Sequence, residues 1–428
     1  MLALPALAVQ AAAQSSVLVN AAVVGRLGIA PLASLAVGGA VLAVVGGLST
    51  MLAHGTTGRA ARWHGADVPA AAAVEGVQAA WLALSVGVAT TVAVQIGAQP
   101  LAQVLAGGPG EVAAGAALWL RVASLGVPGS LLTMAGIGWM RGVQDTRRPL
   151  VYTVEASVLS TVLCLILVHP LELGLLGSAV SAAAAQTLSG AMCVRALAGE
   201  GVELRPRGEL IRSQLAFGRN LFLRDVAFQV CFISAAVVAA RLGPAALGAH
   251  HVVLKLWLFC ILALESVAIA AQSLIGADLG AGQSSQARGT ALLVGLLGGV
   301  CGLGFAVVLG AGATGLVGLF TTDRAVLNQA LAAWPWLVIM LPLAGVVLAL
   351  EGVLTGAGDL KYLRNLSLVS VLGVFLPAIW LTHTLHLGLG GIWVGLTLFF
   401  ALRLVALVPW LIRGRWTVVG DPAVVEPR

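Results

Sequence analysis

The sequence predicts an all-α integral membrane protein with twelve transmembrane helices in two pseudo-symmetric six-helix lobes. Hydrophobic residues make up 59% of the chain and charged residues only 9%, and the mean hydropathy is +1.01. A soluble domain carries about 25% charged residues, so this chain has too few to cover a water-facing surface. A short sequence that recurs about half a chain apart predicts the division into two equivalent halves.

Twelve stretches are apolar for the roughly 20 residues that a membrane-spanning helix needs. The predicted segments are 1–24, 32–53, 71–98, 112–139, 149–169 and 172–195, then 213–240, 246–276, 286–312, 325–355, 361–382 and 388–413. The first stretch lacks the basic start of a signal peptide, so we expect it to be retained as a helix. The predicted domains are an N-terminal lobe (1–198), a cytoplasmic linker (199–212), a C-terminal lobe (213–413) and a cytoplasmic tail (414–428).

The repeated sequence closes the fourth and the tenth apolar segment. It consists of Met140-Arg141-Gly142-Val143-Gln144-Asp145 in the first half and Leu354-Thr355-Gly356-Ala357-Gly358-Asp359 in the second. Arg26-Leu27-Gly28 likewise recurs as Arg241-Leu242-Gly243. Six spans in each half predict a parallel repeat about an axis along the membrane normal, with a cleft between the lobes. Such an architecture is most often that of a transporter.

Basic residues are concentrated in alternate connections between the apolar segments. One side carries Arg59, Arg62, Arg141, Arg147, Arg148, Arg195, Arg205, Arg207, Arg212, Arg288, Lys361, Arg364, Arg413 and Arg415. The other side carries only Arg26, Arg241 and Arg324. Because basic loops remain in the cytoplasm, this asymmetry predicts that both termini are cytoplasmic. It also explains the net charge of +6 without nucleic-acid binding.

Catalytic and metal-binding motifs are missing from the sequence. No Gly-x-x-x-x-Gly-Lys-Ser/Thr loop occurs, and the five cysteines lie one per apolar segment without metal-ligand spacing. We therefore expect no enzyme activity, no structural metal and no cofactor apart from a coupling ion, H⁺ or Na⁺.

The ordered set of motifs resembles the MATE (multidrug and toxic compound extrusion) family, and within it the DinF-type branch. The resemblance is carried by residues 24–28, 141–150, 241–250, 268–274 and 351–359. It implies twelve helices in two lobes and antiport of small organic, often cationic, compounds against protons or sodium ions. It also marks Gln272 as a substrate- or ion-binding candidate, and Arg141 and Glu351 as gating or structural residues.

The first helix departs from the family pattern at Asn20. The family typically has an aspartate there, linked to protons and substrate in the DinF-type branch. An amide cannot titrate, so proton coupling would need another group. The asparagines that the family has on its fifth helix appear here as Ser160 and Cys164, whereas Glu155 stands where a small apolar residue is usual. We consider Glu155 a compensating acid for Asn20, or a side chain that extends to the cytoplasmic surface.

Ionisable residues inside predicted spans are candidates for function because each costs free energy in a bilayer. Asp225 and Lys255 lie at comparable depth in adjacent spans, and we predict that they pair, either as a self-neutralising structural pair or as part of a moving site. Glu265 is flanked by small residues and is either a hydrogen-bonded structural acid or a titrating cation site. Asp145 and Asp359, at cytoplasmic helix ends, are expected to cap the next helix and to pair with a nearby arginine.

The sequence therefore favours a secondary active exporter of multiple drugs and toxic compounds, driven by cation-coupled antiport with alternating access. Two alternatives stay open: a flippase for lipid-linked or polysaccharide precursors, and a transport-deficient membrane scaffold. Only Arg121, Arg219, Arg224 and Arg403 lie well inside the segments, which is few for a pyrophosphate-binding cleft. The expected partners are membrane lipid and a small organic, cationic substrate. We expect a multi-pass monomer in the plasma membrane.

Overall fold

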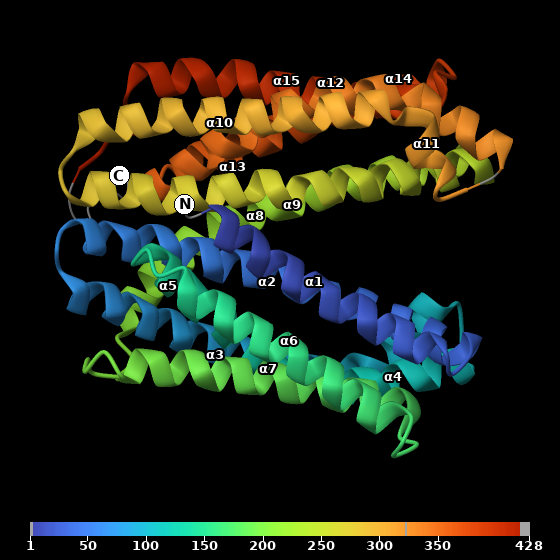
Figure 1. The fold of residues 1–428 in the computed structure, drawn as a ribbon, viewed down its shortest axis with the longest axis horizontal. Coiled ribbons are helices and arrows are strands. Elements are labelled where there is room, and N and C mark those ends of the chain that lie inside the picture. The colour runs from blue at the N-terminus through green and yellow to red at the C-terminus, as the bar shows by residue number, and fades with distance from the viewer. Residues whose placement is uncertain (1–2, 322, 420–428) are drawn as a thin grey trace. The chain divides into compact units, whose positions relative to one another are not determined.

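The computed structural model describes residues 3–321 and 323–419 and consists of helices joined by short connections (Figure 1). No strand occurs in these described ranges, which confirms the predicted all-α class. The chain divides into two compact units, Met1–Arg219 and Asn220–Arg428. The boundary between the units falls inside one helix. The last part of the predicted tail, residues 420–428, lies outside the described residues.

The helices of the first unit follow the predicted segments in order. They are α1 (Ala3–Gly25), α2 (Ile29–Gly65), α3 (Pro69–Ala106), α4 (Glu111–Ala123), the 3-10 turn η1 (Ser124–Gly126), α5 (Val127–Gly142), α6 (Arg147–Val168) and α7 (Gly174–Ala198). The predicted fourth span consists of α4, η1 and α5, with Pro128 in the first turn of α5. A proline is tolerated there because that position has no helical hydrogen bond to lose.

The second unit begins within α8 (Gly208–Arg241) and has the same order of spans. Its further elements are α9 (Pro244–Gly280), α10 (Ser284–Ala311), α11 (Ala313–Gly318), α12 (Arg324–Ala357), α13 (Leu360–Ser370), the π-helical turn η2 (Val371–Phe375), α14 (Leu376–Thr384) and α15 (Gly388–Arg413). The segment α13–η2–α14 corresponds to the predicted fifth span of this half.

Most of these helices are long and apolar enough to cross a membrane. Among the described residues ten helices meet that criterion, and the bent helix α2 brings the number to eleven. The remaining predicted span is α7, which has 25 residues and could cross about 30 Å of hydrocarbon at about 1.5 Å per residue. All twelve predicted segments therefore coincide with helices.

The fourth span is the central helix of each unit. In the first unit α5 packs against α2, α3 and α7, the second, third and sixth spans. In the second unit α12 packs against α9, α10 and α15, which are again the second, third and sixth spans. The internal packing of the two halves thus repeats, as the duplicated motif predicts.

The duplicated motif forms the same kind of helix end in both units. Gln144 and Gly358 have φ angles of 61° and 81°, in the left-handed region. The N–H of Asp145 donates to the carbonyl of Met140 (2.8 Å), and the N–H of Asp359 donates to that of Leu354 (3.0 Å). A residue in the left-handed region, followed by an N–H that bonds to the carbonyl five residues earlier, forms a Schellman cap. This cap satisfies the last carbonyl groups of a helix.

The motif glycines lie at close contacts between the second and fourth spans. A Cβ at Gly142 would lie 2.6 Å from Cβ of Ala60 on α2, and a Cβ at Gly356 would overlap the backbone of Gln272 on α9. Only glycine permits such an approach of two backbones, and membrane helices associate largely through contacts of this kind. The repeat therefore encodes a packing contact together with a helix end.

The predicted end of the second span at residue 53, with Arg59 and Arg62 in the loop after it, is wrong. Arg59 and Arg62 lie in the last turns of α2, where both are buried. The guanidinium of Arg59 donates two hydrogen bonds to Glu75 on α3 (3.0 and 2.8 Å) and one to Ser213 on α8 (2.8 Å). A buried guanidinium needs such a counter-ion, so the helix can extend twelve residues beyond the predicted end at residue 53.

The linker is bound to the first unit. The side-chain amide of Gln78 on α3 donates to the carbonyl of Arg205 (3.1 Å) and accepts from the N–H of Arg207 (2.6 Å). The indole of Trp81, one turn further along α3, donates to the carbonyl of Leu204 (2.7 Å). The segment before α8 is thus held along α3 by side chains that satisfy its backbone.

We expect Gly356→Leu to destabilise the second unit by about 1–3 kcal/mol, the usual cost of overpacking a filled core. The added side chain would meet the backbone of α9. The apparent melting temperature of the purified chain in detergent measures the effect. Gly304→Leu is the matched control, because a Cβ at Gly304 on α10 has nothing within 4 Å. Equal stability of the two variants would contradict this account of the repeat.

Candidate functional site

A buried cluster of charged side chains occupies the second unit. Its centre is Glu351 on α12, whose side chain is 6% exposed. Arg403 on α15, with a side chain that is fully buried, donates to Oε1 of Glu351 from Nε (2.9 Å) and Nη2 (2.5 Å). A pair of bonds from one guanidinium to one carboxylate is both strong and directional, so these two spans are fixed to each other at this depth.

Aromatic and hydroxyl groups complete the environment of Arg403. Its guanidinium carbon lies 5.0 Å from the ring centre of Phe228 and 5.2 Å from that of Phe399. Its Nη1 donates to the hydroxyl of Ser367 on α13 (2.9 Å). Cation–π contacts of this kind stabilise a desolvated guanidinium, so Arg403 is held from three sides.

A second arginine links Glu351 to another acid. Arg224 on α8 lies 3.8 Å from Oε2 of Glu351 and 3.2 Å from Oδ1 of Asp225. Glu265 on α9 is half-buried and lies close enough to Arg224 for their charges to interact. The cluster thus joins three carboxylates and two guanidinium groups from α8, α9, α12 and α15.

The predicted pair between Asp225 and Lys255 is wrong. The ion-pair partner of Asp225 is Arg224, the preceding residue in the chain. Lys255 is exposed on α9 and forms no ion pair with any residue in the described ranges. The sequence places Lys255 at the expected depth, but a long flexible side chain can extend away from the helix packing and keep its ammonium group solvated.

A polar cavity of about 270 Å³ lies inside the first unit, between α1, α5, α6 and α7. Its lining includes Asn20, Thr153, Ser160 and Ser189. Three buried oxygen atoms there, Oδ1 of Asn20 and the hydroxyls of Thr153 and Ser189, have no hydrogen-bond partner among the described residues. Buried polar atoms are normally satisfied, so this cavity is suited to a ligand or ion that brings its own donors or its positive charge.

Glu155 does not line this cavity. It is exposed on α6, whereas Thr153 and Ser157 of the same helix line it. Two residues along an α-helix correspond to about 200° of rotation, so Glu155 lies on a different face from its neighbours. The structure does not bring a carboxylate to Asn20, and no Asp or Glu lines the cavity as the described residues define it. Cys164 is buried on α6 and is not part of the lining either.

The two aspartates of the repeat have different contacts. Oδ1 of Asp145 accepts hydrogen bonds from the N–H groups of Arg147 (3.0 Å) and Arg148 (3.1 Å) at the start of α6. Its Oδ2 lies 3.3 Å from the Arg148 guanidinium. Asp359 accepts instead from the indole N–H of Trp410 (2.8 Å), and this indole is stacked on Tyr362 at 4.1 Å. Asp145 caps a helix, whereas Asp359 connects α15 to the start of α13.

The other two predicted residues lie at helix contacts. Arg141 is half-buried in the last turn of α5, beside the motif glycine Gly142. Gln272 is buried on α9, with its backbone against Gly356. Among the described residues no group of three His, Cys, Asp or Glu side chains could hold a metal ion.

The sequence did not identify Arg224 and Arg403 as partners of the buried acids. Their position inside predicted spans indicates only that each arginine should pair with a carboxylate or face a water-filled cavity. The pairing was not deducible because Glu351 and Arg403 are 52 residues apart and on different helices. Thr153 and Ser189 were also missed, because hydroxyl groups often satisfy themselves within their own helix.

We expect Glu351→Gln to lower the free energy of unfolding by about 3 kcal/mol, since it leaves Arg403 buried without its carboxylate. The double variant Glu351→Gln, Arg403→Met should recover much of that loss. Denaturant unfolding in detergent measures both. Glu203→Gln is the control, because Glu203 is 70% exposed and its pair with Arg207 is long (3.8 Å), so a change of about 0.5 kcal/mol or less is expected. A double variant that is less stable than Glu351→Gln would contradict the pairing.

Asp359, between α12 and α13, predicts a pH dependence of stability. Burial raises the pKa of its carboxyl group above the ordinary 3.8, and the hydrogen bond from Trp410 offsets part of this rise. Because the folded chain binds this proton more tightly than the unfolded chain, the group adds stability as the pH falls through its folded pKa. Wild type should gain melting temperature relative to Asp359→Asn between about pH 7 and about pH 4.

Trp410→Phe provides a second measurement of the same effect. It removes a donor that favours the ionised carboxylate, so the gain on acidification should be larger in this variant than in wild type. A loss of stability of wild type relative to Asp359→Asn on acidification would contradict the assignment.

Known proteins resemble this chain over most of its length. The MatE family model matches residues 5–166 and 221–381, which is more than half of the chain. DNA damage-inducible protein F of Escherichia coli (strain K12) is 31% identical over 398 residues, which are 90% of this chain and 85% of that protein. The chloroplastic protein DETOXIFICATION 44 of Arabidopsis thaliana is 34% identical over 76% of this chain. The chain spans only 63% of that plant relative's length.

The fold is that of solved transporters. A MOP superfamily transporter from Pyrococcus furiosus superposes with a TM-score of 0.88 over 97% of this chain and 95% of that one, at 21% identity. The repeated packing of six spans in each half is consistent with this fold. The chain belongs to the MatE family, and it has the fold of the solved MOP superfamily transporter.

Proposed function

We propose that this transporter exports small organic cations by antiport against H⁺ or Na⁺. Substrate would bind in a cleft between the two lobes, which open alternately to the two sides of the membrane. Membership of the MatE family supports export of toxic compounds as the general activity. The buried charged side chains of the second unit indicate which acid binds the coupling cation.

The close arrangement of three carboxylates around Arg224 and Arg403 carries this proposal. Arg403 is bound to Glu351, and Arg224 lies between Glu351 and Asp225. With Glu265, three carboxylates are present for two guanidinium groups. Carboxylates gathered this closely inside a membrane protein are suited to take up a proton or a monovalent cation.

Coupling requires that this cation bind with different affinity in the two states of the transporter. Glu265, on the second span of the unit, is the acid that we assign to this step. Glu351 and Asp225 each have a guanidinium within ion-pair distance, so neutralising either of them would remove the partner of a buried arginine. Neutralisation at Glu265 would change its attraction to Arg224, and this gives α8 and α9 a charge-dependent contact.

The cavity of the first unit supports a different role. Its lining holds amide and hydroxyl oxygens and no carboxylate among the described residues. Asn20 cannot gain or lose a proton, so we assign the cavity to polar groups of the substrate or to a dehydrated cation and not to proton transfer. The two halves of the transporter would then have separate tasks.

We also propose an orientation in the membrane and an oligomeric state. The asymmetric loop charges support cytoplasmic termini in the plasma membrane. We propose a monomer with no cofactor besides the coupling ion. A flippase for pyrophosphate-linked precursors is less well supported, because Arg224 and Arg403 are bound to carboxylates, and Arg121 and Arg219 are exposed.

The proposal is tested by efflux of ethidium from proteoliposomes under imposed proton or sodium gradients. Wild type should move the dye with one of the two gradients. Glu265→Gln should reduce this movement to that of protein-free vesicles, because the acid that we assign to cation uptake is then an amide and cannot ionise. Glu203→Gln is the matched control and should transport at the wild-type rate, since Glu203 lies at the surface.

The outcomes separate the alternatives. Dye movement that ignores both gradients would overturn the coupling proposal. No dye movement, combined with flipping of a labelled lipid-linked diphosphate, would indicate a flippase, and the absence of both activities would indicate a scaffold. Full activity of Glu265→Gln would remove Glu265 from the mechanism and leave the export assignment intact.

A further inference from the structure

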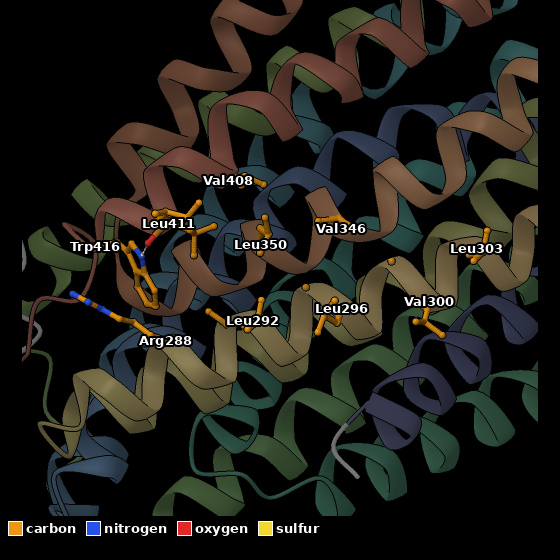
Figure 2. Close-up of a pocket in the computed structure, with 14 residues that line it drawn as sticks. Arg288, Leu292, Leu296, Val300, Leu303, Val346, Leu350, Val408, Leu411 and Trp416 are labelled. Atoms are coloured by element: carbon orange, nitrogen blue, oxygen red, sulfur yellow. Dashed lines mark hydrogen bonds between the residues drawn. The ribbon is translucent and has the colours of Figure 1, made fainter.

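An apolar groove of about 560 Å³ runs along the second unit between α10, α12 and α15 (Figure 2). Its lining consists of Arg288, Ala291, Leu292, Gly295, Leu296, Gly299, Val300, Leu303, Val346, Leu350, Val408, Leu411, Ile412 and Trp416. Arg288 is the only charged side chain among them. Figure 2 shows Arg288 and Trp416 at one end of the groove and Leu303 at the other.

The shape of the groove follows from residue spacing on α10. Arg288, Leu292, Leu296 and Val300 are four residues apart and therefore lie on one stripe of the helix. Gly295 and Gly299 lie beside this stripe, and a Cβ at either would meet α12, 3.2 Å from Leu350 or 3.1 Å from Val346. Close packing of α10 on α12 thus forms the floor, while Leu292 and Leu296 remain 68% and 60% exposed on the wall.

The groove is long enough to span one leaflet of a bilayer. From Arg288 to Leu303 the helix rises by about 22 Å, at about 1.5 Å per residue. A leaflet contributes about 15 Å of hydrocarbon, half of the roughly 30 Å core. An extended acyl chain could therefore lie in the groove with its head group level with Arg288.

Positive charge is concentrated at the Arg288 end. The guanidinium lies over the end of α15, where a Cβ at Gly414 would overlap it, and the exposed residues Arg413 and Arg415 flank that glycine. Arg288 donates a long, weak hydrogen bond to the hydroxyl of Thr417 (3.5 Å). It has no ion-pair partner in the part of the chain that the structure describes. Most of its five N–H donors are thus available to an anion.

Trp416 closes this end of the groove. Its side chain is buried, and its indole N–H donates to the carbonyl of Leu411 (3.0 Å). Tryptophan is typical of the level at which lipid head groups meet the hydrocarbon. The start of α10, with its free N–H groups, adds a partial positive charge at the same end.

We propose that this groove is a binding site for one anionic glycerophospholipid. The acyl chain would lie along α10 against α12 and α15, and the phosphate would accept hydrogen bonds from Arg288. Basic pockets at the ends of membrane helices are suited to such head groups. A second copy of the chain fits less well, because a symmetric contact through this face would bring Arg288 near its own equivalent. The proposal is independent of the transport function.

The test uses the purified full chain in detergent, titrated with dioleoylphosphatidylglycerol while its melting temperature is recorded. A bound lipid should raise the melting temperature in a saturable manner. Arg288→Gln should raise the half-saturating concentration about fivefold, the factor that one arginine contributes near an anionic surface. Arg288→Lys should change it less than about twofold, since the charge is retained.

The controls separate a lipid site from general charge effects. Arg195→Gln removes an exposed arginine from the end of α7, outside the groove, and should titrate like wild type. Dioleoylphosphatidylcholine and inorganic phosphate should give no saturable stabilisation, because one lacks the net charge and the other lacks the acyl chain.

Three results would overturn the proposal. They are equal titration of Arg288→Gln and wild type, equal stabilisation by phosphatidylcholine or by phosphate, and a light-scattering mass of twice 43.3 kDa with no response to phosphatidylglycerol. The last result would make the groove a contact between subunits. The melting temperature of Arg288→Gln without lipid should match wild type, because the arginine is exposed and makes one weak hydrogen bond.

Discussion

Backbone contact between the second and fourth spans is the constraint on which each unit depends. In lipid, helices gain little from burying apolar side chains against one another, so close packing and polar contacts hold them together. Gly142 meets α2, and Gly352 and Gly356 meet α9, at positions where any Cβ would collide. Glu351 directly precedes Gly352. The contact that fixes α12 on α9 therefore also fixes the depth of the central carboxylate.

The positions of the spans could be predicted from the sequence because bilayer thickness sets their length. The residues around the repeat were sufficient to relate its glycines to close helix packing. They were also sufficient to predict that Asp145 caps a helix. The partner of Asp225 could not be predicted, because depth along a helix does not define the direction of a side chain. Arg224 reaches its neighbour, and Lys255 extends away from the packing.

The burial of individual polar side chains could not be predicted from the residues next to them in the sequence either. Arg59 lies in a predicted loop and Gln78 inside a predicted span, yet the structure buries both polar side chains. Their burial depends on Glu75 and on the linker backbone, which are supplied by other parts of the chain. The polar cavity around Asn20 is a similar case, because its hydroxyl groups come from helices that are distant in sequence.

The two units divide the chemistry of the protein unequally. The first unit offers neutral oxygens around Asn20, whereas the second has buried ionised groups around Glu351. The internal packing of the two units is shared, and each has a buried ion pair, Arg59 with Glu75 in the first and Arg403 with Glu351 in the second. The polar cavity around Asn20 and the extended cluster of charged groups around Glu351 are the parts that differ.

The helix α8 belongs to both units. Its first turns are tied to the first unit by Ser213 and Gln214, which bind Arg59 and Glu75, and its residues from Asn220 onward belong to the second. The linker before it is held on α3. Because the start of α8 is fixed to α2 and α3, residues 208–219 should stay folded for as long as the first unit does.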